Sequence, residues 1–262
     1  MNQTTAMENI LKFAIHSTAH IENNRYSTEI ANQGYTFIDS YTFQKIQEED
    51  NFFNVCEQDI IEFVDSWNTL DIDQFMSDKG KYRTRKHATF TVNNSDKIIL
   101  KNKYMPHFQT IEYNPLNGGI ARYFTEIDKK TIENPIFKNL LQFAYFTFSE
   151  IKKENWFVEA HQFRIKAKPN DLGKPTPEGI HRDGVDFVLM ALINRQNIQG
   201  GITKIYNLDK VLKTELMLEN FLDIALVDDH QVYHSVTKTK VDNIEKEKIG
   251  LRDVLVITFK KV

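Results

Sequence analysis

A mainly β fold with supporting helices (α+β) is predicted by a change in hydrophobic periodicity near Trp156. Before this residue, apolar side chains recur at helical spacing. After it, β-branched and aromatic residues gather in short runs of period two, separated by turn residues. Many short strands at close spacing, preceded by helices, favour a jelly-roll barrel buttressed by N-terminal helices.

The N-terminal half contains the expected helices. Apolar residues at helical spacing predict helices over residues 7–19 and 60–67. Gly34 is expected to end a short helix before a strand at residues 35–38. Pro135 occupies a first-turn position, and the apolar run that follows it predicts a buried supporting helix.

The C-terminal half contains most of the expected strands. They are residues 156–166, 180–183, 187–194, 202–206, 224–236, which a turn near Asp228 interrupts, and 254–259. Only residues 208–221 have helix length between strands, so a doubly wound α/β sheet fits poorly. Because no repeat or linker is found, residues 1–262 are predicted to form one domain, with about 1–155 as a helix-rich support and about 156–262 as the jelly-roll core.

Composition argues against several classes of partner. The 33 basic and 36 acidic residues are interspersed and the net charge is -3, so neither a nucleic acid nor an anionic membrane is expected. The longest apolar runs are far shorter than the roughly 18 residues that span a bilayer. No secretory signal pattern is present at the N-terminus, and one cysteine, Cys56, cannot form an internal disulfide. We therefore expect a protein of the reducing cytoplasm.

The triplet His181-Arg182-Asp183 is the strongest candidate for chemistry. On a strand, residues i and i+2 point to the same side, so the imidazole and the carboxylate can reach one point in space. A distant histidine, His234 or its neighbour His230, can complete the set. Two imidazoles and one carboxylate suit Fe(II) and leave adjacent positions open for an oxoacid and O2. By itself, however, such a triplet arises by chance in many proteins.

Arg252 is a second candidate, at the beginning of the last expected strand. A guanidinium at the mouth of an apolar barrel is costly to bury without an anion, and its planar fork matches a carboxylate. We expect that carboxylate to belong to 2-oxoglutarate. A salt bridge to Asp253 is the alternative.

Several segments in this order resemble a known family, the Fe(II)/2-oxoglutarate-dependent dioxygenases, and within it the branch of free amino acid hydroxylases that includes bacterial L-isoleucine 4-dioxygenase. The resemblance covers roughly residues 80–260 and is fainter before residue 161. The segments are residues 161–167, His181-Arg182-Asp183, Leu189-Met190, Gly200-Gly201, Asn207, residues 233–237, Arg252-Asp253 and Thr258-Phe259, with residues 83–85 and 118–122 upstream.

The resemblance implies a cupin-like double-stranded β-helix and specific roles. His181, Asp183 and His234 would bind Fe(II), and Arg252 would bind the distal carboxylate of 2-oxoglutarate. His234 is preferred to His230 because its flanking residues match those of the family. The enzyme would consume O2 and 2-oxoglutarate, hydroxylate an unactivated C–H bond of a free L-amino acid, and release succinate and CO2.

Further polar residues are candidates for binding the co-substrate or the substrate. Gln162 and Arg164 share one side of their strand, which we expect to line the barrel and steady 2-oxoglutarate; an exposed polar strand face is the alternative. His161 points to the other side of this strand and is expected to pack outside the barrel. Arg122, after a Gly-Gly turn, is expected to bind a substrate carboxylate unless it is a surface arginine. The basic cluster at residues 79–86, which includes Arg83 and Arg85, is expected to be a solvated flank of a hairpin. Asp186 and Glu178 are expected to bind the polar groups of the substrate.

Three rival functions make different structural predictions. The same chemistry could serve a peptide or protein side chain, or another small molecule, and a charged groove would favour a peptide or protein. A cupin-like metal-binding protein without oxygenase activity would pair Arg252 internally and leave no room for an oxoacid. In a non-catalytic binding module, His181, Asp183 and His234 would not converge.

Overall fold

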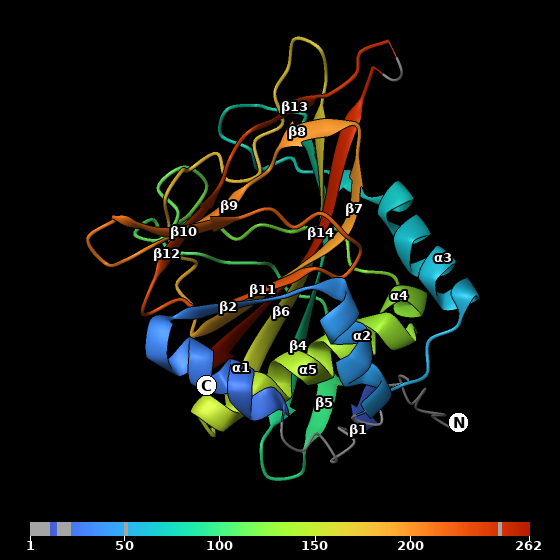
Figure 1. Ribbon diagram of the computed structural model, residues 1–262, viewed down its shortest axis with the longest axis vertical. Coiled ribbons are helices and arrows are strands. Elements are labelled where there is room, and N and C mark those ends of the chain that lie inside the picture. The colour runs from blue at the N-terminus through green and yellow to red at the C-terminus, as the bar shows by residue number, and fades with distance from the viewer. Residues whose placement is uncertain (1–10, 15–21, 50–51, 246–247) are drawn as a thin grey trace, which may run out of the picture.

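The computed structural model describes residues 11–14, 22–49, 52–245 and 248–262, and one large antiparallel sheet dominates it (Figure 1). In sheet order the strands are β1 (Lys12–Ala14), β5 (Ile98–Lys101), β4 (Arg83–Asn93), β6 (Trp156–Ala167), β14 (Gly250–Lys261), β7 (Phe187–Gln196), β11 (Ile224–Asp228) and β2 (Tyr35–Ile38). A further short strand, β3 (Asp71–Ile72), pairs with β4.

Two small antiparallel sheets complete the β structure. One has the order β10 (Leu212–Leu216), β9 (Thr203–Tyr206), β12 (Tyr233–Val236), and the other pairs β13 (Thr239–Val241) with β8 (Ile198–Gly200). The mainly β prediction is confirmed. Over the described ranges the sheets lie as separate layers and do not close into a continuous barrel.

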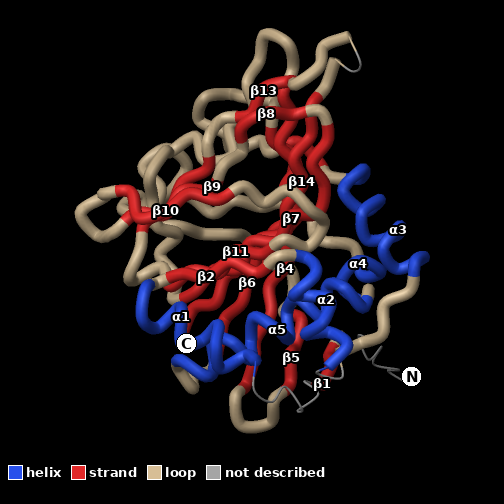
Figure 2. Tube along the Cα trace, viewed as in Figure 1, coloured by secondary structure: helices blue, strands red, loops and turns tan. Residues whose placement is uncertain are grey.

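The helices gather on one side of the large sheet (Figure 2). The longest, α5, begins where the Asn134 side chain accepts a hydrogen bond from the Ile136 N–H and Pro135 fixes the first turn, as the sequence predicts. In chain order the helices are α1 (Glu22–Gln33), α2 (Ser40–Glu49), α3 (Glu57–Asp65), the 3-10 turn η1 (Ser66–Thr69), α4 (Lys129–Glu133) and α5 (Pro135–Ile151).

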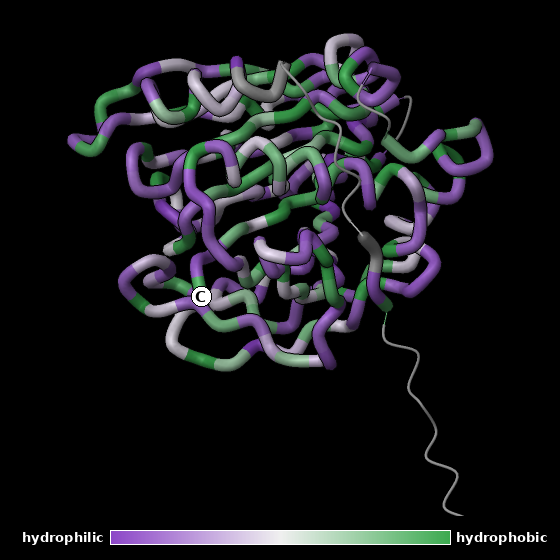
Figure 3. Tube along the Cα trace, turned by 90° about the horizontal axis from the view of Figure 1, so that it is seen from below, coloured by the Kyte–Doolittle hydropathy of each residue, from purple (hydrophilic) through white to green (hydrophobic). Residues whose placement is uncertain are grey.

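Each face of the large sheet has its own apolar core because side chains alternate along the strands. Leu189, Leu255 and Phe259 face the helices and pack with residues of α5 such as Phe148. Their neighbours on the strands, such as Val188 and Val254, face the small sheet of β9, β10 and β12. Apolar stretches consequently run through the middle of the molecule, whereas the peripheral loops are largely hydrophilic (Figure 3). The second face, toward the small sheet, is the one that lines the candidate site.

Most predicted strands are confirmed, including the interruption after Asp228. There, the Asp228 carboxylate accepts a hydrogen bond from the His230 N–H, and its carbonyl accepts those of Gln231 and Val232, which turns the chain between β11 and β12.

Two predictions of secondary structure are wrong. Residues 12–14 form β1, which pairs with β5, although a helix was predicted over residues 7–19; the rest of that segment, apart from Leu11, lies outside the described residues. Residues 180–183 form no strand and meet the opposite chain only through one bridge, His181 to His234. The segment 208–221 contains β10, whose residues hydrogen-bond to β9.

No helix in the described part of the chain is long and apolar enough to cross a membrane.

Candidate metal centre and substrate cavity

A cavity of about 430 Å³ lies against the inner faces of β4, β6, β14 and β7. The loops at residues 105–114 and 175–185 line it as well, together with His234 and Val236 of β12. This volume is within the range of small-molecule sites in enzymes. Apolar side chains such as Met190 and Val256 form part of its wall, and the charged side chains are grouped at separate places.

One group consists of His181, Asp183 and His234, whose ligand atoms all lie within 4.8 Å of one another. The two histidines are paired through their backbones: each N–H donates to the carbonyl of the other at 3.0 Å. Asp183 Oδ1 lies 3.7 Å from His181 Nε2, and Asp183 Oδ2 lies 3.5 Å from His234 Nε2. One ion with bonds of about 2.1 Å can span these separations. We call these residues the metal triad.

The loop that carries Asp183 is held by a buried carboxylate. Asp229 accepts hydrogen bonds from the backbone N–H groups of Asp183 (2.9 Å), Gly184 (2.8 Å) and Val185 (3.3 Å). Gly184 has a positive φ of 78°, and a Cβ there would come within 2.4 Å of the Tyr113 ring. Only glycine therefore suits this turn.

The electrostatics of the triad favour a cation. The His181 Nδ1–H donates to the carbonyl of Gly179 at 2.9 Å, which leaves Nε2 with its lone pair toward Asp183. Burial opposes ionisation of Asp183, but the hydrogen bond and charge of His234 hold the pKa of this carboxyl well below its usual range. In the same way Asp183 outweighs burial and raises the pKa of His234. The donor set fits Fe(II): two imidazoles and an ionised carboxylate on one side of the ion.

His230, the alternative third histidine, lies elsewhere. Its side chain is 57 % exposed and its Nε2 is 3.2 Å from Asp186 Oδ1. The structure thus brings His234, and not His230, to His181 and Asp183.

Arg252 lies at the start of β14 and lines the same cavity. It is buried, and no carboxylate of the described residues lies within ion-pair distance of it. Asp253, the alternative partner, instead accepts two hydrogen bonds from Arg164, at 2.7 and 2.8 Å. Burial and then the neighbouring Arg195 lower the pKa of Arg252 to about 10, so it remains a cation at neutral pH. A buried, unpaired guanidinium calls for an anionic ligand.

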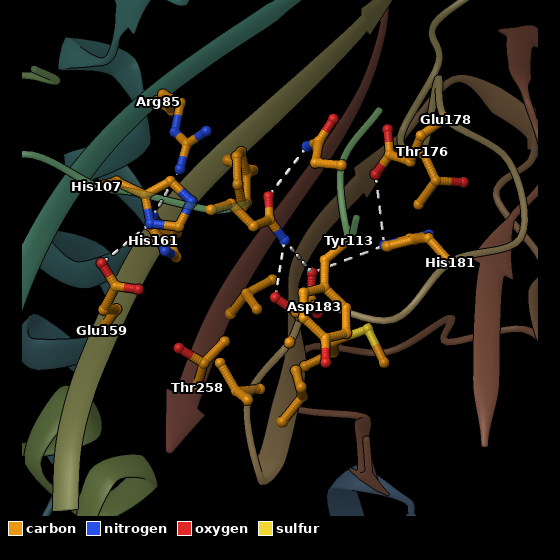
Figure 4. A pocket seen from close by; sticks show the side chains of 18 of the residues that line it. Arg85, His107, Tyr113, Glu159, His161, Thr176, Glu178, His181, Asp183 and Thr258 are labelled. Carbon is orange, nitrogen blue, oxygen red and sulfur yellow. Dashed lines mark hydrogen bonds and ion pairs between the residues drawn. The ribbon is translucent and has the colours of Figure 1, made fainter. Parts of the chain in front are cut away.

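A second group of charged and polar residues lies at the cavity, on the side away from the metal triad (Figure 4). Glu159 Oε1 accepts hydrogen bonds from His87 Nε2 and His107 Nδ1, both at 3.0 Å. The group, which we call the polar cluster, consists of Arg85 and His87 from β4, Glu159 and His161 from β6, and His107 and Arg122 from the segment between β5 and α4.

Arg122 therefore lies in the cavity, as its expected role requires, but the other members of the polar cluster were missed. Arg83, Arg85 and His87 alternate on β4, as do Glu159 and His161 on β6, so each set shares a strand face. This period-two pattern was available in the sequence. The flank of residues 79–86 was expected to be solvated, yet Arg83 and Arg85 are buried.

The expectation that Gln162 and Arg164 line the cavity is wrong. Gln162 Nε2 donates to Ser66 Oγ at 2.8 Å, and Arg164 Nη1 donates to Asn68 Oδ1 at 2.8 Å. Both face η1 on the outer side of β6, because that turn and Asp253 supply their polar partners. His161, expected outside, faces the cavity instead.

Asp186 is also misplaced by the sequence prediction. Its carboxylate binds Lys152 Nζ at 2.9 Å and the Lys261 N–H at 2.9 Å, outside the cavity. Glu178, by contrast, lines the cavity with Oε1 3.4 Å from His181 Nε2.

The chain as a whole is similar to proteins of one known family. Residues 64–258 match the model of the 2OG-Fe dioxygenases. A 3(1)-hydroxy-L-isoleucine 4-dioxygenase of Pantoea ananatis is 27% identical over 245 residues, covering 90% of this chain and 95% of the relative. An L-isoleucine-4-hydroxylase of Bacillus thuringiensis is 27% identical over 238 residues, covering 88% and 92%.

Solved structures agree with this fold. A bsmA homolog from Methylobium petroleophilum superposes with a TM-score of 0.81 at 26% identity, covering 95% of this chain and 96% of that one. IDO from Bacillus thuringiensis gives a TM-score of 0.75 at 20% identity, covering 92% and 99%. With the matched region extending over most of the sequence, this chain belongs to the family of Fe(II)- and 2-oxoglutarate-dependent dioxygenases.

Proposed function

We propose that the metal triad of His181, Asp183 and His234 binds Fe(II), that Arg252 binds the distal carboxylate of 2-oxoglutarate, and that the enzyme hydroxylates a free L-amino acid. The observation that carries the assignment is the convergence of the triad in the same cavity as Arg252, which is buried and has no ion-pair partner in the described part of the chain. The names of the relatives, which act on L-isoleucine or its hydroxy derivative, support the substrate class.

The residues of the chain have separate tasks in this reaction. When bound together, Fe(II), 2-oxoglutarate and O2 supply the oxidative decarboxylation to succinate and CO2 and the insertion of one oxygen atom into an unactivated C–H bond. Asp229 fixes the loop of Asp183, and the Gly179 carbonyl orients the His181 ring. Arg252 fixes one end of the co-substrate, and the apolar wall limits the access of water.

The rival functions lack comparable support. A cupin-like protein without oxygenase activity would pair Arg252 with a protein carboxylate, and a non-catalytic module would not bring the triad together. A cavity of about 430 Å³ suits a small substrate better than a protein side chain on its backbone.

Anaerobic titration tests the assignment of the co-substrate. The Fe(II) protein should develop the weak visible charge-transfer band of a chelated oxoacid when 2-oxoglutarate is added. Asp183→Ala should lose the band. Its absence in the wild type, or its persistence in the variant, would refute the metal assignment.

Succinate release, measured over the free L-amino acids, tests the substrate class. At least one amino acid should stimulate it above the uncoupled rate. Equal rates with all of them and with none would argue against an amino acid hydroxylase.

We also propose that residues 1–262 form one domain that acts in the cytoplasm. The single cysteine, Cys56, is free and exposed, which suits a reducing compartment.

A further inference from the structure

The polar cluster has no role in binding iron or 2-oxoglutarate as proposed above. It lies across the cavity from Asp183, with Arg85, His107, Glu159 and His161 close together (Figure 4). Such a concentration of buried charge is unfavourable for folding unless its members are paired or bind a ligand. The pairing of each charge therefore indicates what the cavity accepts.

Arg85 of the polar cluster shares one carboxylate with Arg83, two residues earlier on β4. Asp73 Oδ2 lies 2.7 Å from Arg83 Nη2 and 3.6 Å from Arg85 Nη1. Arg85 also donates from Nη2 to His161 Nδ1 at 2.7 Å and stacks on the Phe124 ring, 3.7 Å from its centre. These two guanidinium groups are thus held by protein contacts.

Arg122 has no acidic partner among the described residues. It is only 1% exposed, and its hydrogen bond goes from Nη2 to the neutral amide oxygen of Gln109 at 3.2 Å. Its Nε is buried without an acceptor in the part of the chain that the structure describes. Arg122 is therefore a buried cation that lines the cavity and lacks an anion.

Glu159 is the complementary case. Both hydrogen bonds that it accepts end on Oε1, so over the described residues Oε2 has no donor. Burial lowers the pKa of His107 to about 4 and lowers that of His87 as well, so both imidazoles are neutral at pH 7. Although burial opposes it, these imidazoles lower the pKa of Glu159 to about 2. Glu159 is thus an anion that contacts no cation among the residues that the structure describes.

His107 joins these two unpaired charges. Its backbone exchanges hydrogen bonds of 3.0 and 2.9 Å with Arg122, and its ring donates to Glu159. A cation-binding and an anion-binding group therefore stand next to each other on one wall of the cavity. A ligand complementary to them has a carboxylate and an ammonium group attached to one carbon atom.

We propose that Arg122 binds the α-carboxylate and Glu159 the α-ammonium group of the amino acid substrate. This inference rests on the proposed function, and it adds where the substrate is held and how it is oriented. Gln109 Nε2 lies 3.4 Å from Asp183 Oδ1, and Gln109 Oε1 accepts the hydrogen bond from Arg122. One amide group thus separates Arg122 from the metal triad, and Arg122 Nη2 lies at most about 9 Å from Asp183 Oδ1. A head group at Arg122 directs the side chain, rather than the α-carbon, to the metal.

A second metal ion is the other ligand that these residues could attract. His87, His107, Glu159 and His161 have ligand atoms within 4.8 Å of one another. However, Arg85 donates to His161 Nδ1, which leaves the proton of this neutral ring on Nε2 and withdraws both nitrogens from coordination. Arg85 and Arg122, which both lie near Glu159, also repel a divalent cation. A zwitterion matches the cluster better.

Anaerobic calorimetry on the enzyme loaded with Fe(II) and 2-oxoglutarate tests the inference without turnover. The probes are L-isoleucine, L-isoleucinamide, which lacks the carboxylate, and 3-methylpentanoate, which lacks the ammonium group. Wild type should bind L-isoleucine about ten- to a hundredfold more tightly than either analogue. Arg122→Gln should abolish the preference over the amide, and Glu159→Gln should abolish the preference over 3-methylpentanoate.

The controls separate a local role from misfolding. Both variants should retain the 2-oxoglutarate charge-transfer band, and Glu126→Gln, a partly exposed carboxylate paired with Lys101, should retain both preferences. Equal binding of the three probes by wild type, or unchanged preferences in the variants, would overturn the inference while the proposed function stands. If none of the free amino acids binds, the inference falls together with the substrate class. Two metal ions per chain, one of them lost in His107→Ala, would overturn it in favour of a second metal site.

Discussion

Replacing Asp229 with asparagine should weaken metal binding although Asp229 does not belong to the metal triad. Its carboxylate accepts three backbone N–H groups from the loop that carries Asp183. Asparagine keeps one acceptor oxygen and turns the other into a donor that faces an N–H group. Since hydrogen bonds to a charged group contribute about 1.5–3 kcal/mol each, and burial beside Asp183 offsets part of this, we expect a loss of about 2 kcal/mol in the free energy of unfolding.

The affinity for the metal should fall as well, because the loop is no longer fixed. Changes in residues that orient metal ligands typically reduce affinity about 10- to 100-fold. We expect a loss of this size for Asp229→Asn, measured anaerobically by competition of the protein with a chelator for Fe(II). Urea unfolding of the metal-free protein measures the accompanying loss of stability.

Asp223 provides a matched control at the other end of β11. It too is buried and accepts three backbone N–H groups, those of Ser40 (3.0 Å), Glu219 (2.8 Å) and Asn220 (2.8 Å). Asp223→Asn should therefore destabilise the fold by a similar amount and leave the affinity for Fe(II) within about threefold. Equal losses of affinity in the two variants, or none in Asp229→Asn, would refute the reasoning.

Three further predictions follow from the site. Arg252→Gln should raise the KM for 2-oxoglutarate about 10- to 100-fold, whereas Arg25→Gln on the surface should not change it; equal KM values would exclude Arg252 from the co-substrate site. His234→Ala should abolish Fe(II) binding in chelator competition and His230→Ala should retain it, and the reverse order would reassign the third ligand. Burial lowers the pKa of His107 to about 4, so below about pH 6.5 its imidazole is protonated in the unfolded chain but stays neutral in the folded protein. Up to about 3 kcal/mol of the free energy of unfolding is therefore lost as the pH falls from 6.5 to 4. Urea unfolding between pH 7 and 4.5 should show a smaller loss for His107→Gln, and parallel curves would contradict the assignment.

The sequence predicted the metal triad better than it predicted the strand around it. His181 and Asp183 were placed together by assuming a strand, but the structure has only a single bridge from His181 to His234. That bridge aligns the side chains as a strand would. The pattern of residue types therefore predicted which side chains converge even though the local structure differed.

The orientation of β6 could not be predicted from its own residues. Period two correctly separated Gln162 and Arg164 from His161, but it does not say which face is inside. The outer position of Gln162 and Arg164 depends on Ser66 and Asn68, which are distant in sequence. A polar face was assumed to line the cavity, whereas it binds polar groups of η1.

The segment between β5 and α4 shows a different limit. It contributes His107, Gln109 and Arg122 to the cavity, yet its residues 102–128 contain no helix or strand in the structure. Without a period, a sequence pattern cannot show which side chains face a site. Only the contacts of His107 with Glu159, and of Gln109 with Asp183 and Arg122, identify them.

The reciprocal backbone hydrogen bonds between His181 and His234 also affect which metal the protein acquires. They fix the backbones of two histidines that are far apart in the chain, and the fold thereby sets the two side chains close together without an ion. A rigid set of two imidazoles and a carboxylate binds Co(II), Ni(II) and Cu(II) more tightly than Fe(II). The metal found in the purified enzyme should consequently follow the supply of ions during synthesis, and reconstitution with Fe(II) is required before its activity is compared with that of any relative.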